Sequence, residues 1–146
     1  KVYAVDVGKG QLAWKLRKDP RVLVMEKTNA RELTPARFST PFDPVDLIVI
    51  DCSFISLQKI LPAAVALLRN SGSILALIKP QFEAGKAEAD KGKGVITDPS
   101  IHERVIATLR RYVHHQSNLR WRRLTESPLL GPAGNKEFFV LIEKVG

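Results

Sequence analysis

The stretch from Ser73 to Glu83, SILALIKPQFE, decides the fold of this chain. A continuous apolar run of this length is typical of a strand that is buried on both faces of a parallel sheet. Lysine is rarely buried without a partner and proline cannot continue a strand ladder, so Lys79 is expected where the strand ends. Ligands bind at the carboxyl ends of strands in open α/β sheets, which makes Lys79 a candidate site residue. The alternative is a strand-terminal lysine that reaches solvent.

The rest of the chain alternates expected strands with expected helices. The last two strands lie too close together for a helical crossover, so they should pair antiparallel. This order predicts one α/β domain with a doubly wound, mostly parallel sheet that ends in an antiparallel hairpin. The glycine-containing segment 80–97 is expected to be a long loop with room to act as a lid. Strands are expected over residues 2–7, 22–25, 46–51, 73–79, 119–126 and 137–143, and helices over 11–18, 57–68 and 98–116.

Composition narrows the class of protein. The chain has 146 residues, which is the size of one domain, and a formal net charge of +8. This charge favours a polyanionic partner, although many basic proteins have no role with nucleic acid. No apolar run approaches the roughly 18 residues of a membrane span. The single cysteine, Cys52, excludes an internal disulfide and favours a reducing compartment such as the cytoplasm.

Three of the expected strands end in an acid. Asp6, Glu26 and Asp51 each follow an apolar run, as Lys79 follows the fourth. Parallel strands place these ends on one edge of the sheet, so the side chains should converge. Carboxylates there can accept hydrogen bonds from ribose hydroxyls, whereas the alternative for each single acid is to cap the helix that follows. Three acids and a lysine on one edge favour a ligand-binding site over separate helix caps.

Basic groups elsewhere are weaker candidates. Lysines on the glycine-containing segment could bind phosphates or simply keep the segment solvated. Arginines beside Trp121 suit RNA backbone and base stacking, and a solvated basic face with a half-buried Trp121 is the alternative. The three histidines show no metal-ligand spacing and are expected at the surface. The groups are Lys86, Lys91 and Lys93, then Arg110, Arg111, Arg120, Arg122 and Arg123, and finally His102, His114 and His115.

Five motifs, taken together and in order, resemble one known family. They are similar to those of the TlyA (hemolysin A) family, a branch of the FtsJ-like S-adenosylmethionine-dependent RNA methyltransferases, and the similarity runs nearly end to end. The resemblance implies a class I methyltransferase (Rossmann-like) fold and S-adenosylmethionine as cofactor. It also implies 2′-O-methylation of ribosomal RNA, with ribosomal subunits as partners. The motifs are residues 2–12, 26–31, 51–57, 79–83 and 134–138.

The resemblance assigns roles to single residues. Asp51, Lys79 and Glu137 match the last three members of the family's catalytic Lys-Asp-Lys-Glu tetrad. Asp51 and Lys79 would orient and activate the hydroxyl, with Glu137 holding the lysine. Lys86, Lys91, Lys93 and Arg122 are the candidate RNA-binding residues. The cofactor-binding residues, with Asp6 at the ribose, are expected to be Asp6, Val7, Glu26, Asn29 and Asp51.

Parts of the family pattern have no counterpart in this sequence. The chain begins at Lys1 inside an expected strand, so residues 1–146 are expected to be a methyltransferase domain truncated at its amino terminus, without an S4-type RNA-binding domain. The absent parts include the first tetrad lysine, the glycine-rich cofactor loop and the strand before that loop. In the family's strand order this strand lies between those that end at Asp6 and Asp51, so its absence would leave two strand edges unpaired. We expect the excised segment, a neighbouring chain or a rearrangement to fill that gap.

Function follows from these expectations with two alternatives. A free lysine is protonated at neutral pH, so without the first tetrad lysine Lys79 is expected to act as an orienting donor, and the chain to methylate poorly or not at all. The family's older name suggests a membrane-active cytolysin, although no spanning helix or strongly amphipathic segment is present. A non-catalytic RNA-binding remnant is the other alternative. RNA 2′-O-methylation is the leading hypothesis.

Overall fold

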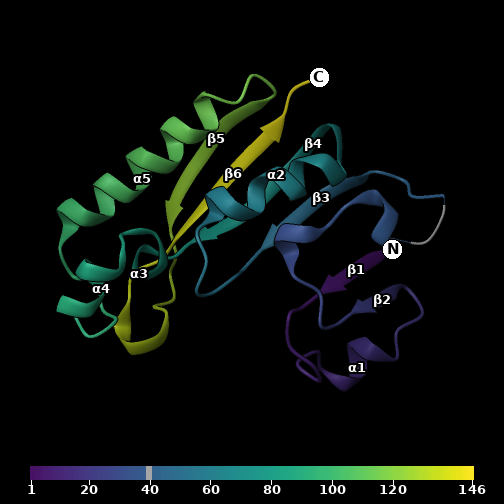
Figure 1. Cartoon of the computed structure of the whole chain (residues 1–146), viewed down its shortest axis with the longest axis horizontal. Coiled ribbons are helices and arrows are strands. Elements are labelled where there is room, and N and C mark those ends of the chain that lie inside the picture. Colours follow the sequence, from purple (N-terminus) through teal and green to yellow (C-terminus); the bar gives the residue numbers. More distant parts are fainter. Residues whose placement is uncertain (39–40) are drawn as a thin grey trace.

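The strands of the described residues form two separate sheets (Figure 1). The computed structural model describes residues 1–38 and 41–146. In the smaller sheet, β1 (Val2–Val5) pairs in parallel with β2 (Val22–Met25). In the larger sheet β6 runs antiparallel to β4 and β5, which confirms the expected hairpin. The larger sheet has the order β3-β4-β6-β5, with β3 (Val45–Ile50), β4 (Leu68–Ile78), β5 (Leu119–Glu126) and β6 (Phe138–Lys144).

Two helices cover the larger sheet, α2 (Leu57–Leu67) and α5 (Pro99–His114). Asp98 accepts a hydrogen bond from the backbone N–H of Ser100 at 2.8 Å, so α5 begins where its capping residue predicts. The other helical segments of the described residues are one or two turns long. They are α1 (Trp14–Arg17), α3 (Pro80–Glu83) and α4 (Lys86–Lys91), with 3₁₀ turns at Ala30–Glu32, Pro35–Arg37 and Pro132–Gly134.

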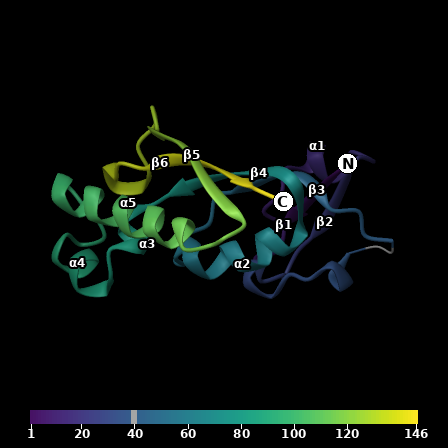
Figure 2. The ribbon, with the colours of Figure 1, turned by 90° about the horizontal axis from the view of Figure 1, so that it is seen from above.

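Both long helices lie on the same face of the larger sheet (Figure 2). Burial along β4 therefore alternates. Ile74, Ala76 and Ile78 face the helices and are 0% exposed. Leu75 and Leu77, on the other face, are only half-buried. The strand was expected to be buried on both faces, and in the described structure one face is fully covered.

The boundary between α2 and β4 is set by a residue from the far end of the chain. The Lys144 ammonium donates to the carbonyl oxygens of Val65 at 3.0 Å and Leu68 at 2.6 Å. These bonds satisfy carbonyls that the end of a helix leaves open. Leu68 then pairs with Val45, so the strand begins five residues earlier than the expected Ser73.

Two other expectations about local structure were wrong. The helix expected over residues 11–18 is only the single turn α1, because it has little to pack against: Leu16 remains 47% exposed. The segment 80–97, expected to be a loop, contains α3 and α4. Asn135 holds the end of this segment, since its side chain accepts from the Ile96 N–H at 2.9 Å and donates to the Gly94 carbonyl at 2.8 Å.

One histidine was also placed wrongly by the sequence. His102 was expected at the surface, but it is 6% exposed and packs edge-on against Phe138. Its Nε2 lies 2.9 Å from the Ile96 carbonyl oxygen. His102 lies on the face of α5 that carries Val105 and Leu109, so helical periodicity buries it with them.

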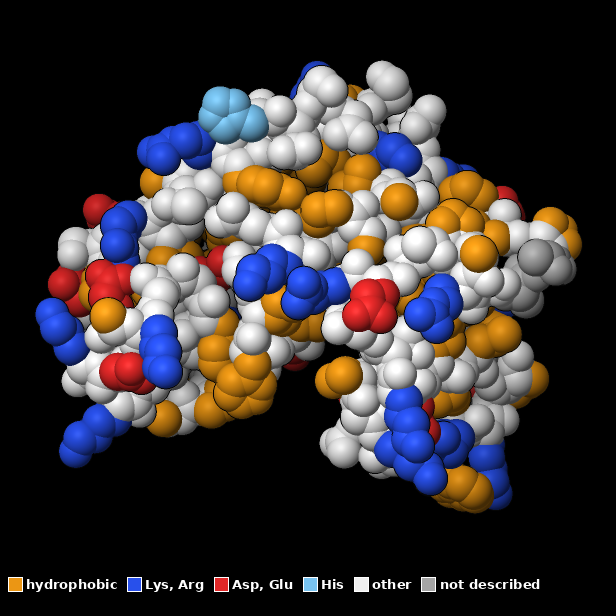
Figure 3. Space-filling model, in the orientation of Figure 1, with side chains coloured by type: hydrophobic (Ala, Val, Ile, Leu, Met, Phe, Trp, Pro, Cys, Tyr) orange, Lys and Arg blue, Asp and Glu red, His pale blue; other side chains and the backbone are white. Residues whose placement is uncertain are grey.

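Within the described residues, the two strand edges beside the expected gap have no strand partner. β1 pairs with β2 alone, and β3 pairs with β4 alone. Two apolar side chains of β3 are also exposed, Leu47 at 55% and Val49 at 66%. A deep notch separates the part that carries β1, β2 and α1 from the part that carries α3 and α4 (Figure 3).

Candidate active site

Asp51 and Lys79 meet at the ends of neighbouring strands. β3 and β4 are parallel, so their carboxyl ends lie on one edge of the sheet. The Lys79 Nζ lies 2.6 Å from Asp51 Oδ1 and donates to Ser53 Oγ at 3.2 Å. The Lys79 side chain is 11% exposed, whereas that of Asp51 is 66% exposed. The pair therefore presents an open carboxylate to a ligand, with a nearly buried cation behind it.

Glu137 lies next to this pair in the sheet but does not join it. Ile78 is opposite Phe138 at the end of the antiparallel register of β4 and β6, and Lys79 and Glu137 are the next residues beyond this pair. Gln81 donates from Nε2 to Glu137 Oε1 at 3.1 Å, and both side chains are buried. In the described structure Lys79 forms its ion pair with Asp51, and Glu137 forms none with Lys79.

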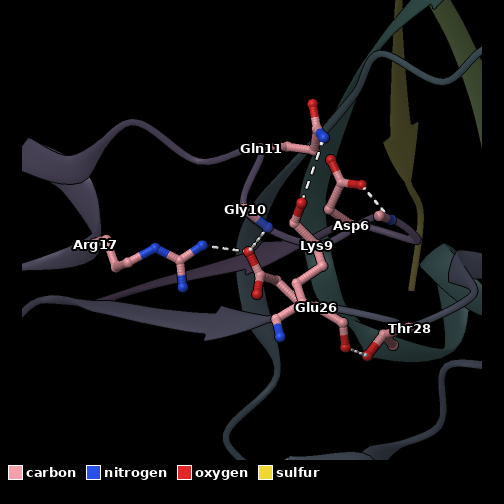
Figure 4. Close-up of polar contacts among 8 residues, drawn as sticks. Asp6, Lys9, Gly10, Gln11, Arg17, Glu26 and Thr28 are labelled. Carbon is pink, nitrogen blue, oxygen red and sulfur yellow. Dashed lines mark hydrogen bonds and ion pairs between the residues drawn. The ribbon is translucent and has the colours of Figure 1, made fainter.

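Asp6 and Glu26 come together at the carboxyl ends of β1 and β2 (Figure 4). Asp6 Oδ1 accepts from the Gly8 N–H at 2.7 Å, and Glu26 Oε1 accepts from the Gly10 N–H at 2.6 Å. The Arg17 guanidinium also donates to this Glu26 oxygen. Arg17 first and the Gly10 N–H second lower the pKa of Glu26 below its ordinary value, so its carboxylate stays charged. A cavity of about 150 Å³ lies here, lined by Ala4, Val5, Asp6, Gln11, Leu12, Val24 and Glu26.

The two remaining cofactor candidates have other surroundings. Val7 is 75% exposed in the turn after β1. Asn29 accepts from the Arg31 N–H at 3.1 Å and caps the 3₁₀ turn that begins at Ala30. Neither lines the cavity, so of these four cofactor candidates the structure brings only Asp6 and Glu26 to it.

The basic candidates divide into two groups. Lys86 and Lys91 begin and end α4, Lys93 follows it, and all three are exposed. Arg122 instead forms an ion pair with Glu143, at the opposite end of β6 from Glu137. The Arg110 guanidinium lies 5.2 Å from the centre of the half-buried Trp121 ring and so occupies one face of that ring.

Sequence reasoning missed an aromatic pair beside Lys79. The Phe54 and Phe82 rings are 4.8 Å apart, and Phe54 is 89% exposed with a φ of 64°. A non-glycine residue rarely adopts a positive φ, and such backbone clusters at functional sites. The sequence did hold a signal: each phenylalanine stands three residues after a candidate catalytic residue, Asp51 and Lys79. Ser53 and Gln81 were missed as well.

Comparison with known proteins identifies relatives along nearly the whole chain. The TlyA 16S/23S rRNA (cytidine-2'-O)-methyltransferase of Mycobacterium tuberculosis is 49% identical over 142 residues, covering 95% of this chain and 50% of the relative. Hemolysin A of Brachyspira hyodysenteriae is 39% identical over 138 residues, covering 94% of this chain and 56% of the relative. The chain thus spans about half the length of these curated relatives.

Solved structures agree on the fold. "Putative hemolysin from Streptococcus thermophilus" has a TM-score of 0.90 at 43% identity, covering 99% of this chain and 50% of that one. The N-methyltransferase NodS from Bradyrhizobium japonicum, in complex with S-adenosyl-L-homocysteine, has a TM-score of 0.58 at 15% identity. It covers 97% of this chain and 65% of that one, and at this identity the likeness shows the fold alone.

The helices of the described residues are too short or too polar to cross a bilayer. Residues 1–144 match the family model described as FtsJ-like methyltransferase. The larger sheet of this chain has the strand order β3-β4-β6-β5, with β6 reversed between β4 and β5. The chain belongs to the FtsJ-like methyltransferase family and has its class I methyltransferase fold.

Proposed function

We propose that this protein methylates ribose 2′-hydroxyls of ribosomal RNA, with S-adenosylmethionine as the methyl donor. The observation that supports it most is the Asp51–Lys79 pair at the strand edge, with an exposed carboxylate and a nearly buried ammonium. The TlyA protein of M. tuberculosis, named as an rRNA (cytidine-2'-O)-methyltransferase, is the related protein that suggests the substrate.

The cofactor would bind at the ends of β1 and β2. The cavity there has apolar walls from Val5 and Val24 and two carboxylates, Asp6 and Glu26, which fit the ribose of a nucleoside. Glu26 uses one oxygen for Gly10 and Arg17, which leaves its other oxygen for a hydroxyl. When bound, S-adenosylmethionine supplies an electrophilic methyl group.

The residues of β3 and β4 would prepare the nucleophile. Asp51 accepts a hydrogen bond from the ribose hydroxyl, and the Lys79 ammonium holds the Asp51 carboxylate in place. Lys79 is held in turn by Ser53. Lys79 thus orients the reacting groups as a cation, and Asp51 is the acceptor for the hydroxyl proton.

RNA would be held by aromatic and basic side chains near this edge. Phe54 presents its ring to solvent beside Phe82, and a base of single-stranded RNA can stack on such a surface. Lys86, Lys91 and Lys93 would contact phosphates. A protein that modifies ribosomal RNA would work in the cytoplasm.

The test is Lys79→Ala in the protein at its full cellular length. We expect methyl transfer to ribosomal RNA to fall by about 100-fold or more, because the carboxylate loses its fixed cation. Cofactor affinity, measured by calorimetry, should stay within about threefold, since Lys79 does not line the cavity at Asp6 and Glu26. Lys59→Ala on the exposed side of α2 is the matched control. Unchanged methylation by Lys79→Ala would refute the assignment of Lys79 as the cation that orients Asp51.

A further inference from the structure

The Gln81–Glu137 pair is unusual for a protein interior. Gln81 is 7% and Glu137 6% exposed, and the amide Nε2 donates to the carboxylate at 3.1 Å. The other polar atom of the amide, Gln81 Oε1, is buried without a hydrogen-bond partner. Within the described residues, the Glu137 side chain accepts this hydrogen bond from Gln81 and forms no ion pair.

Folding alone does not account for such a pair. A buried carboxylate without a cation and a buried carbonyl without a donor each cost free energy. Apolar side chains of similar volume would fill the same space without either cost. The pair is therefore expected to serve the site next to it.

The glycine at position 131 shows how closely the carboxylate is held. A Cβ at Gly131 would lie 2.2 Å from Glu137 Oε1 and 2.6 Å from its Cδ. The Gly131 N–H is bonded to the Asn135 carbonyl at 2.8 Å, which fixes this turn. Glu137 is thus held by the Gln81 amide and pressed against the backbone of residue 131.

The way in which Glu137 is held matters for the bonding of Lys79. Ile78 and Phe138 form the last pair of the β4–β6 register, and Lys79 and Glu137 are the next residues beyond that pair. A lysine and a glutamate that start from neighbouring positions can form an ion pair. Here Lys79 bonds to Asp51 and Ser53 instead. Lys79 and Gln81 also stand at the start of the same short helix, α3, so one segment positions both.

We propose that Gln81 is a positioning residue for the reaction: its amide holds the Glu137 carboxylate away from Lys79, so that the lysine stays paired with Asp51. Glu137 then acts on Lys79 as a nearby charge rather than as a partner. Without the amide, Glu137 competes with Asp51 for the lysine, and Asp51 loses its fixed orientation. This proposal rests on the proposed function, because the Asp51–Lys79 pair is the group that it serves.

The test is Gln81→Met, which keeps the length of the side chain and removes the amide. We expect kcat for methyl transfer to fall by about 10- to 100-fold, because Asp51 loses its orientation. The KM for RNA and the cofactor affinity should stay within about twofold. The urea midpoint should change little, because the unpartnered Gln81 carbonyl is gone and Glu137 exchanges the amide for Lys79. Gln116→Met, the same change on a half-buried glutamine after α5, is the control and should leave kcat unchanged.

A crystal structure of Gln81→Met gives a second readout that needs no activity. We expect the Lys79 Nζ to contact Glu137 and to leave Asp51. A kcat within twofold of the wild type, or Lys79 still paired with Asp51, would overturn the proposal. A loss of activity that only follows a loss of stability would overturn it too. If the wild-type protein does not methylate RNA, the proposed function fails, and the crystal structure still decides this one.

Discussion

The two sheets of this protein are built from similar sequences and are buried very differently. β2 consists of Val22-Leu23-Val24-Met25, which is as apolar as the middle of β4. No residue of β1 or β2 is fully buried, whereas β4 and β6 carry much of the core. The core cluster begins at Ile50 and contains no residue from the smaller sheet.

The difference shows that apolar sequence becomes core only where neighbours are available. β4 has a strand on each side and two helices over one face. β1 and β2 have one another, the single turn α1 beside β2, and the rings of Phe38 and Phe42 against Tyr3 of β1. A two-stranded sheet is marginal without further packing. The expected site is divided in the same way, with the cofactor carboxylates on the weakly packed sheet and Asp51 and Lys79 on the well-packed one.

Amide hydrogen exchange should show the largest contrast. Amides of β4 and β6 should exchange only through global unfolding, which costs about 5–15 kcal/mol in a domain of this kind. Amides of β1 and β2 should open at a free energy about 3 kcal/mol or more below that value, because few buried contacts hold them. Equal protection in both sheets would show that they unfold as one unit.

A matched pair of substitutions sharpens the contrast at single residues. Val140→Ala removes two buried carbons from a side chain that is 1% exposed, and should lower the free energy of unfolding by about 2 kcal/mol. Val24→Ala makes the same change at a half-buried position and should cost about 1 kcal/mol or less. Urea unfolding measures both. A larger cost at Val24 would contradict the division of the core.

The smallest effect concerns pH and the smaller sheet. Arg17 keeps the pKa of Glu26 below its ordinary value of 4.5. A lowered acid pKa adds stability above the ordinary value and loses it as pH falls through the folded value. Arg17→Met removes the largest cause of this shift. The difference in urea midpoint between wild type and variant should therefore be greatest near pH 7 and should narrow below pH 4.5.

Arg37→Met, a change at an exposed arginine of a 3₁₀ turn, is the control for that experiment. It should give the same difference from wild type at both pH values. If Arg17→Met also differs from wild type equally at pH 7 and below pH 4.5, the ion pair does not carry the pH dependence.

Much of the architecture could be predicted because it depends on local pattern. β5 runs over Leu119–Glu126 as expected, and Asp98 caps α5 as expected. The family resemblance is confirmed over residues 1–144. The start of β4 could not be predicted, because Lys144 ends α2 from a distance of more than 70 residues along the chain.

The candidate site also has one part that the sequence predicted and one part that it did not. Strand order by itself indicated that Asp51 and Lys79 would share an edge, since the carboxyl ends of parallel strands meet. The partner of Glu137 was not visible in the sequence: the resemblance suggested Lys79, and the structure has Gln81.

The amino-acid sequence therefore determined the alternation of strands and helices, the acids at the strand ends and the family. Hydrophobic period and capping residues act over a few positions, so these features are readable along the chain. Only the tertiary structure decided which apolar strand became core, which oxygen Lys79 bonds to, and that Glu137 is held beside Gly131. Those outcomes depend on which groups, far apart in sequence, come close enough to pack or bond. Their distances are set only when the chain folds.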